Sequence, residues 1–144
     1  PMQWSTSANK GFSKAAANNL WLPVDTDEKA PNVAEQEKNP NSMLARTKKL
    51  VAMRRNQIAL DADADFKILY AEKDKYPFAF VREKMGEKVV VVLNPSKNDV
   101  EIEIPLKFGK KTLQLSGFKA SQIPSTKGTK INLKGISYAV YKVY

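Results

Sequence analysis

Histidine and cysteine are both absent from the 144 residues of this sequence. Without histidine, the chain cannot build Ser-His or Cys-His nucleophile pairs, histidine-ligated zinc or imidazole acid–base chemistry. Without cysteine, it has no thiol chemistry, no disulfides and no thiolate ligands for iron–sulfur clusters. Any catalysis by the chain itself would use carboxylates, lysine or tyrosine. We expect no bound metal and no cofactor.

Long hydrophobic runs are missing as well. The composition, 42% apolar and 27% charged, is that of a globular chain, and no run approaches the roughly 20 apolar residues that span a bilayer. No basic-then-apolar segment of the secretory type stands at the amino-terminus. We expect no membrane partner and one ordinary domain, or a small domain with an extension. The composition assigns no compartment.

Acidic residues are the minority charge, with 15 Asp and Glu against 24 Lys and Arg and a net charge of +9. Such a balance is one mark of nucleic-acid binding. The lysines are scattered, however, and cluster only in pairs such as Lys48-Lys49, Arg54-Arg55 and Lys110-Lys111. We interpret them as solubilising, edge-protecting surface. We expect no nucleic-acid partner, and a basic nucleic-acid-binding domain is the least favoured alternative.

Residues 1–38 show neither a helical nor a strand period. They contain both tryptophans, Trp4 and Trp21, together with Phe12 and Leu22, spread among Asn, Ser, Ala, Pro and Gly. An irregular stretch of this length is uncommon inside a compact domain. We expect it to pack on a protein body that the 144 residues do not contain, as part of a larger protein.

Residues 39–57 predict one α-helix. The pair Asn39-Pro40 fits its start, because Asn caps first-turn amides and Pro suits the first helical position. Basic residues near the end favour a helix carboxy-terminus. Three apolar residues recur every seven positions and define an apolar stripe: Leu44, Val51 and Ile58.

From about residue 64 the hydrophobic period changes from 3.6 to 2. Val89–Leu93 is continuously apolar, which predicts a strand covered on both faces. The segment 84–87 predicts a tight turn. About seven or eight short strands predict a mainly β fold: an antiparallel, Greek-key-like β-sandwich preceded by an irregular segment and one α-helix. The expected strands are 66–70, 76–81, 89–93, 100–104, 113–115, 130–133 and 136–143.

A series of short motifs makes the amino-terminal part more specific. In chain order they are Pro1-Met2-Gln3-Trp4, Gly11-Phe12-Ser13, Trp21-Leu22-Pro23-Val24, Asn32-Val33, Gln36, Asn39-Pro40-Asn41-Ser42 and Ala52-Met53-Arg54. The series resembles the segment after the eighth barrel strand of α-amylase-type glycoside hydrolases, glycoside hydrolase family 13. It most resembles the oligo-1,6-glucosidase, α-glucosidase and trehalose synthase branch. The resemblance covers residues 1–57, and beyond residue 58 it holds only in pattern.

The resemblance implies that residues 1–57 are the last loop and helix of a (β/α)8 barrel. Residues 58–144 would be a carboxy-terminal accessory β-sandwich. It also implies a parent enzyme that acts on α-glucosidic bonds of an α-glucan or oligosaccharide with retention. The nucleophilic Asp, acid/base Glu and stabilising Asp of that family lie on earlier barrel strands and have no counterpart here. We therefore expect the chain to be non-catalytic by itself, with the barrel of the same parent chain as its partner.

Two groups of carboxylates are candidates for a catalytic pair. A retaining glycosidase needs two carboxyl groups about 5–5.5 Å apart on opposite sides of the anomeric carbon. Glu101 and Glu103 alternate along one strand, so both point the same way and we expect them to face water. Asp61, Asp63 and Asp65 lack the Gly and the distal Glu of an EF-hand loop, and we interpret them as a solvated linker. We assign no catalytic, cofactor-binding or metal residue.

Aromatic side chains suggest a different kind of site. Their faces suit the apolar face of pyranose rings, so a carbohydrate-binding β-sandwich is the main alternative function. Aromatics in strands more often pack in the core or across strands, and we favour that interpretation. The residues concerned are Tyr70, Tyr76, Phe78, Phe80, Tyr138, Tyr141 and Tyr144.

Overall fold

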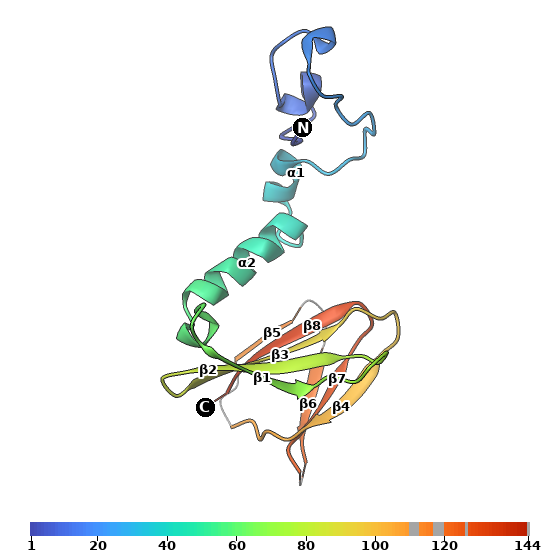
Figure 1. Ribbon diagram of the computed structural model, residues 1–144. Coiled ribbons are helices and arrows are strands. Elements are labelled where there is room, and N and C mark those ends of the chain that lie inside the picture. Colours follow the sequence, from blue (N-terminus) through green and yellow to red (C-terminus); the bar gives the residue numbers. More distant parts are fainter. Residues whose placement is uncertain (110–112, 117–119, 126, 144) are drawn as a thin grey trace. The chain divides into compact units, whose positions relative to one another are not determined.

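The computed structural model (Figure 1) describes residues 1–109, 113–116, 120–125 and 127–143. The chain forms two compact units, Pro1–Ala52 and Met53–Tyr144.

The first unit is largely irregular, as predicted, and is organised by backbone hydrogen bonds. It contains two 3-10 helices, η1 (Ala8–Gly11) and η2 (Ala17–Asn19), and one short α-helix, α1 (Val33–Lys38). The Val33 amide donates to the Gln3 carbonyl at 3.1 Å, which ties the first residues to the start of α1. The Trp21 side chain is 96% exposed, so the described residues provide no burial surface for it.

Helix α2 spans Met43–Arg55, a shorter helix than the one predicted from residue 39. Its cap is Ser42, whose Oγ accepts from the Ala45 amide at 3.1 Å. Asn39 ends α1 instead, and its Oδ1 accepts from the Asn41 amide at 2.9 Å. The predicted start at Asn39-Pro40 was therefore wrong, because the Asn39 side chain closes a turn between two helices. No residue of α2 is buried.

The second unit is an antiparallel β-sandwich, as predicted (Figure 1). The larger sheet has the order β1-β2-β3-β8-β5 and the smaller sheet has the order β4-β7-β6. Among the described strands, the chain thus changes sheets between β3 and β4, between β4 and β5, between β5 and β6, and between β7 and β8. One strand, β6, was not predicted. The strands are β1 (Asp65–Tyr70), β2 (Phe78–Lys84), β3 (Glu87–Asn94), β4 (Val100–Ile104), β5 (Leu113–Ser116), β6 (Ala120–Pro124), β7 (Thr129–Leu133) and β8 (Ser137–Val143).

Strand β3 is covered on both faces over most of its length. Val90 and Val92 are fully buried in the core between the sheets. Val89 points to the opposite face, where Ala59 of the 3-10 helix η3 (Ile58–Leu60) covers it. Burying one such side chain contributes about 1.5–3 kcal/mol. The burial predicted for both faces does not extend to Leu93, the last residue of the apolar run, which is 37% exposed.

The connection from β2 to β3 is the tight turn predicted for residues 84–87. Lys84 pairs with Glu87, which leaves Met85 and Gly86 as a two-residue loop. Both have positive φ, at 49° and 82°, as a type I′ hairpin turn requires. Glycine suits the second position because it lacks a Cβ. This turn sets the register of β2 on β3.

Candidate functional site

The acidic run that precedes β1 is held by basic side chains of β2. The carboxylates are exposed, as predicted, but Lys84 Nζ lies 2.9 Å from Asp61 Oδ2 and 2.7 Å from Asp63 Oδ1. The hydrogen bond from Lys84 lowers the pKa of Asp63. Arg82 Nη2 adds hydrogen bonds to the carbonyl oxygens of Asp61, at 2.6 Å, and Ala64, at 2.9 Å. An ionised, ion-paired carboxylate is a poor general acid, so this run is a structural junction and more ordered than a solvated linker.

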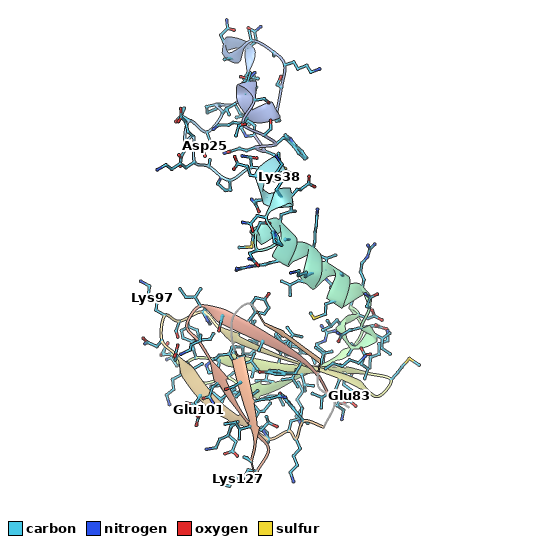
Figure 2. All side chains as sticks on the ribbon, turned by 180° about the vertical axis from the view of Figure 1, so that it is seen from behind. Asp25, Lys38, Glu83, Lys97, Glu101 and Lys127 are labelled. Atoms are coloured by element: carbon cyan, nitrogen blue, oxygen red, sulfur yellow. The ribbon has the colours of Figure 1, made fainter. Side chains whose placement is uncertain are left out.

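Glu101, labelled in Figure 2, and Glu103 are the exposed residues of β4, whose inward neighbours are buried. Both are exposed, as predicted, while Ile102 and Ile104 between and beside them are buried. Lys130 Nζ lies 3.9 Å from Glu101 Oε1, and Ser125 Oγ donates to Glu103 Oε1. Two carboxylates on the same side of one strand do not flank a sugar ring from opposite sides. They therefore lack the arrangement that a retaining glycosidase needs.

The least exposed ion pair of the described residues joins β3 to β8. Lys142 Nζ lies 2.5 Å from Glu87 Oε2, and the two side chains are 21% and 16% exposed. Glu87 Oε1 accepts from the Ala59 amide at 3.1 Å, so one carboxylate also holds η3. Burial would raise the pKa of Glu87, but the hydrogen bonds from Lys142 and Ala59 outweigh it and the pKa is lowered. Sequence reasoning did not find this pair, because 55 positions separate its members.

Asn94 forms a second buried polar centre, at the end of β3. It is 1% exposed, and its Nδ2 donates to the carbonyl oxygens of Asn98 at 2.8 Å and Lys134 at 2.9 Å. Its Oδ1 accepts from Ser96 Oγ at 2.7 Å. The side chain thus joins the loop after β3 to the loop after β7. The step Asn94-Pro95-Ser96 is typical of an ordered turn, but the sequence does not indicate the partners of the Asn94 side chain.

The aromatic residues separate into a buried group and a surface cluster. Tyr141 is fully buried, with its ring centroid 4.9 Å from that of Phe108, so it belongs to the core. Phe80 contacts Phe66 at 5.1 Å and Phe78 at 5.5 Å between ring centroids, with the rings tilted by 35° and 39°. Tyr144 lies outside the residues that the structure describes.

A hollow of about 320 Å³ opens at the edge of the smaller sheet. Its polar groups are partly used internally, since Thr129 Oγ1 donates to the Leu106 carbonyl at 2.7 Å. Gln122 Oε1 is buried and has no hydrogen-bond partner. The described lining contains no carboxylate, and so no acid–base pair. The lining residues are Lys107, Phe108, Gly109, Gln122, Ser125, Gly128 and Thr129.

Part of the basic charge of the described residues is taken up in ion pairs with carboxylates. Among the described residues, seven lysines have a carboxylate oxygen within 4.0 Å of Nζ: Lys48, Lys75, Lys84, Lys88, Lys130, Lys134 and Lys142. The Lys110-Lys111 pair lies outside the described residues. Pairing of this kind leaves fewer cations free for phosphate contacts, which disfavours the nucleic-acid alternative.

In the described part of the chain, no three Asp or Glu side chains are placed so that they could hold a metal ion together. None of the helices described there is both long enough and apolar enough to cross a bilayer.

Two family models match adjoining parts of the chain. The model described as the α-amylase catalytic domain matches residues 1–63, and the maltogenic amylase C-terminal domain matches residues 66–140. The second match alone covers more than half of the 144 residues. The chain therefore belongs to the α-amylase family of glycoside hydrolases, glycoside hydrolase family 13, which confirms the resemblance seen in the motifs.

Curated relatives and solved structures agree with this assignment. The chain is 30% identical to oligo-1,6-glucosidase of Parageobacillus thermoglucosidasius over 99% of its own length and 25% of that protein. It is 29% identical to an amino acid transporter heavy chain of Homo sapiens over 94% of its length and 19% of that protein. It superposes on isomaltulose synthase of Erwinia rhapontici with a TM-score of 0.80 at 25% identity, covering 99% of this chain and 24% of that one. The chain thus spans about a quarter or less of each of these proteins.

Proposed function

We propose that the chain is the non-catalytic carboxy-terminal portion of a retaining, α-glucosidase-type enzyme. Residues 1–57 complete its (β/α)8 barrel, and residues 58–144 form an accessory β-domain. The observation that carries the proposal is the junction of the two family matches, because the catalytic-domain match ends at residue 63 and β1 begins at Asp65.

The chemistry of the described carboxylates supports the non-catalytic part of the proposal. Asp61 and Asp63 are ion-paired with Lys84, and Glu87 is ion-paired with Lys142. Glu101 and Glu103 share one exposed strand face. Retaining hydrolysis needs a nucleophile and an acid/base on opposite sides of the scissile bond. On this proposal, both groups belong to barrel strands that precede Pro1.

The exposed apolar side chains of the first unit support its place in a barrel. Trp21 is 96% exposed, Leu22 56%, Phe12 49% and Trp4 48%. Large apolar side chains gathered on one short segment mark a surface that another protein body covers. On the proposal, that body is the remainder of the barrel, and these residues become buried against it.

The names of the relatives indicate a substrate class for the parent enzyme. One relative is named oligo-1,6-glucosidase, and isomaltulose synthase is described in complex with its natural substrate sucrose. We assign the parent enzyme an oligosaccharide or α-glucan substrate. One relative of similar identity is named for transport. This suggests that the last barrel helix and the β-domain do not themselves decide activity.

A direct test compares the 144-residue chain with the complete polypeptide of its gene on p-nitrophenyl α-glucoside and on isomaltose. We expect hydrolysis only by the complete polypeptide. A matched control replaces its barrel acid/base Glu by Gln and should abolish that hydrolysis. Turnover by the 144-residue chain, or an inert complete polypeptide, would contradict the proposal.

A further inference from the structure

Strand β1 lies at the edge of the larger sheet. Among the described strands it pairs with β2 alone, so one side of its backbone has no neighbouring strand there. Two apolar side chains of β1, Phe66 and Ile68, are 54% and 53% exposed. A free edge with exposed apolar residues is a template for pairing with another strand, and native proteins protect such edges.

Lys67 lies between these two residues and is on the opposite face of the strand. Its partner across the strands is Val81, which is buried in the core between the sheets. Directly opposite residues of an antiparallel pair share a face, so Lys67 is on the inward face. It is nevertheless exposed, and it is not among the seven lysines of the described residues that pair with carboxylates. An inward-pointing charge on an edge strand hinders the addition of another strand.

We propose that the free edge of β1 is a pairing surface for a second copy of this chain, and that the charge of Lys67 keeps it unpaired. A two-fold pair would place β1 antiparallel to its own copy and would close as a dimer, because each chain contributes the same edge. This inference is independent of the proposed function, since it involves only the β-domain.

The symmetric register centred on Lys67 shows why its charge matters. Because side chains alternate along a strand, opposite residues share a face only when the two-fold axis passes through a residue. With the axis at Lys67, Phe66 lies opposite Ile68 of the copy, so the exposed apolar side chains of both chains meet. The same register sets Lys67 opposite Lys67 of the copy, with Cβ atoms about 4.5–5.5 Å apart, where like charges are destabilising.

The register centred on Phe66 brings Asp65 opposite Lys67 of the copy, and these charges attract. It also requires pairing at Ala64, which is buried. The carbonyl oxygens of Ala64 and Asp65 already accept from Arg82 of their own chain, at 2.9 and 3.2 Å. This register therefore competes with hydrogen bonds that hold the start of β1 to β2.

The register centred on Ile68 meets a different obstacle. It sets Lys67 opposite Leu69 of the copy, and Leu69 packs against the core between the sheets. The pairing of β1 is also irregular between Ile68 and Tyr70, which disturbs a further ladder. The charge of Lys67 thus opposes this register as well, because it would approach an apolar contact without a partner.

The test removes the charge of Lys67 from the 144-residue chain. Lys67→Thr leaves a neutral residue that suits a strand. In sedimentation equilibrium at high protein concentration, we expect its weight-average mass to be about twofold that of the wild type. Lys130→Thr is the matched control, because Lys130 is exposed on β7, the central strand of the smaller sheet, and its loss lowers the net charge equally. We expect the control to match the wild type.

Lys67→Glu separates the position of the charge from the net charge of the chain. It removes two positive charges from the total of +9, one more than Lys67→Thr, but it keeps a charged group on the inward face. We therefore expect Lys67→Glu to match the wild type. Association of Lys67→Glu, or equal association of Lys67→Thr and Lys130→Thr, would show that reduced net charge alone is the cause and would overturn the proposal.

Amide hydrogen exchange locates the interface. In the Lys67→Thr dimer we expect slower exchange within residues 66–68 than in the wild type, because backbone groups at the edge become hydrogen-bonded. A dimer without this protection associates elsewhere and contradicts the proposal. Circular dichroism verifies that each variant folds, and Lys67→Gln, neutral but long and polar, takes the place of a Lys67→Thr chain that does not fold. A folded chain with a neutral residue at position 67 that stays monomeric would also overturn the proposal.

Discussion

Lys142 stands directly opposite Val89 on the neighbouring strand, yet its ammonium group reaches diagonally to Glu87, two residues back along β3. The same carboxylate accepts from the Ala59 amide. Three segments that are far apart in the sequence, η3, β3 and β8, therefore meet at one ionised side chain. Because this junction is mostly buried, its energy depends on the charge of Glu87.

The first prediction concerns that charge. Glu87→Gln keeps an oxygen for the Ala59 amide but removes the carboxylate charge that pairs with Lys142, and we expect a loss of about 1–3 kcal/mol in the free energy of unfolding at pH 7. The pKa of Glu87 is lowered in the folded state, so its contribution is present above the unfolded value of 4.5 and is lost as the pH falls through the folded pKa. Urea unfolding from pH 7 to pH 3 should show the wild type and the variant converging.

Glu83→Gln is the matched control for this experiment. Glu83 pairs with Lys88 at 3.3 Å, but those side chains are 44% and 38% exposed. A pair so open to solvent contributes about 0–1 kcal/mol to stability, so we expect a smaller loss from Glu83→Gln than from Glu87→Gln. If the two substitutions lower the free energy of unfolding equally at pH 7, the ion pair of Glu87 contributes no more to stability than an exposed pair.

The second prediction concerns the loop junction at Asn94. Asn94→Ala removes two hydrogen bonds to the carbonyl oxygens of Asn98 and Lys134, and we expect a loss of more than about 2 kcal/mol by urea unfolding, because buried polar groups lose their partners. Asn98→Ala is the control, since the exposed Asn98 contributes its carbonyl oxygen to this junction. A stable Asn94→Ala variant would mean that water replaces the side chain at no cost.

The third prediction concerns the buried phenol of Tyr141, whose hydroxyl has no hydrogen-bond partner among the described residues. Removing an unsatisfied buried hydroxyl avoids its desolvation penalty, so we expect Tyr141→Phe to leave stability at pH 8 unchanged or to raise it by about 1 kcal/mol.

The same phenol gives a signature at alkaline pH. Burial raises the pKa of Tyr141 from 10.0 to about 12. Between these values the unfolded state releases the proton while the folded state keeps it, so stability falls as the pH rises. Between pH 10 and 12, the free energy of unfolding measured with urea should fall less for Tyr141→Phe than for the wild type. If the two proteins lose stability in parallel, burial of the Tyr141 phenol is not the cause of the fall.

The fourth prediction concerns the exposed glutamates. If the complete polypeptide has the proposed activity, we expect Glu101→Gln combined with Glu103→Gln to change its kcat/KM by less than about twofold, because neither carboxylate faces the other across a substrate-sized space. Steady-state kinetics on p-nitrophenyl α-glucoside provide the measurement. A hundredfold loss of kcat/KM with an unchanged unfolding midpoint would contradict the prediction and indicate that these glutamates take part in catalysis.

The strands that the sequence predicted well are those whose local pattern and tertiary environment agree. Val100–Ile104 alternates apolar and charged residues, and the structure buries Ile102 and Ile104 while exposing the glutamates. Strand β6 was missed because Ala120–Pro124 is short, ends in proline and places the polar Gln122 on the inward face. Neither residue type signals a strand.

The helix boundaries show how one side chain can serve competing structures. Asn39 and Ser42 are both good N-caps, and the sequence alone favoured the one before a proline. Helix α1 was missed because six residues are too few for a period, although Asn32 with Glu35 three positions later is a recognisable cap signal. The junctions at Glu87 and Asn94 could not be predicted, because their partners lie 55 and 40 positions away.

The position of β8 between β3 and β5 has a consequence for synthesis. The meander β1-β2-β3 emerges from the ribosome first, and its valine-rich edge has no neighbour until residues 137–143 arrive. During that interval the nascent sheet exposes unpaired amides and carbonyls beside apolar side chains, the arrangement that recruits foreign strands into aggregates. Expression of this fold should therefore depend on how quickly translation passes from Asn94 to Val143, or on a chaperone that shields the open edge meanwhile.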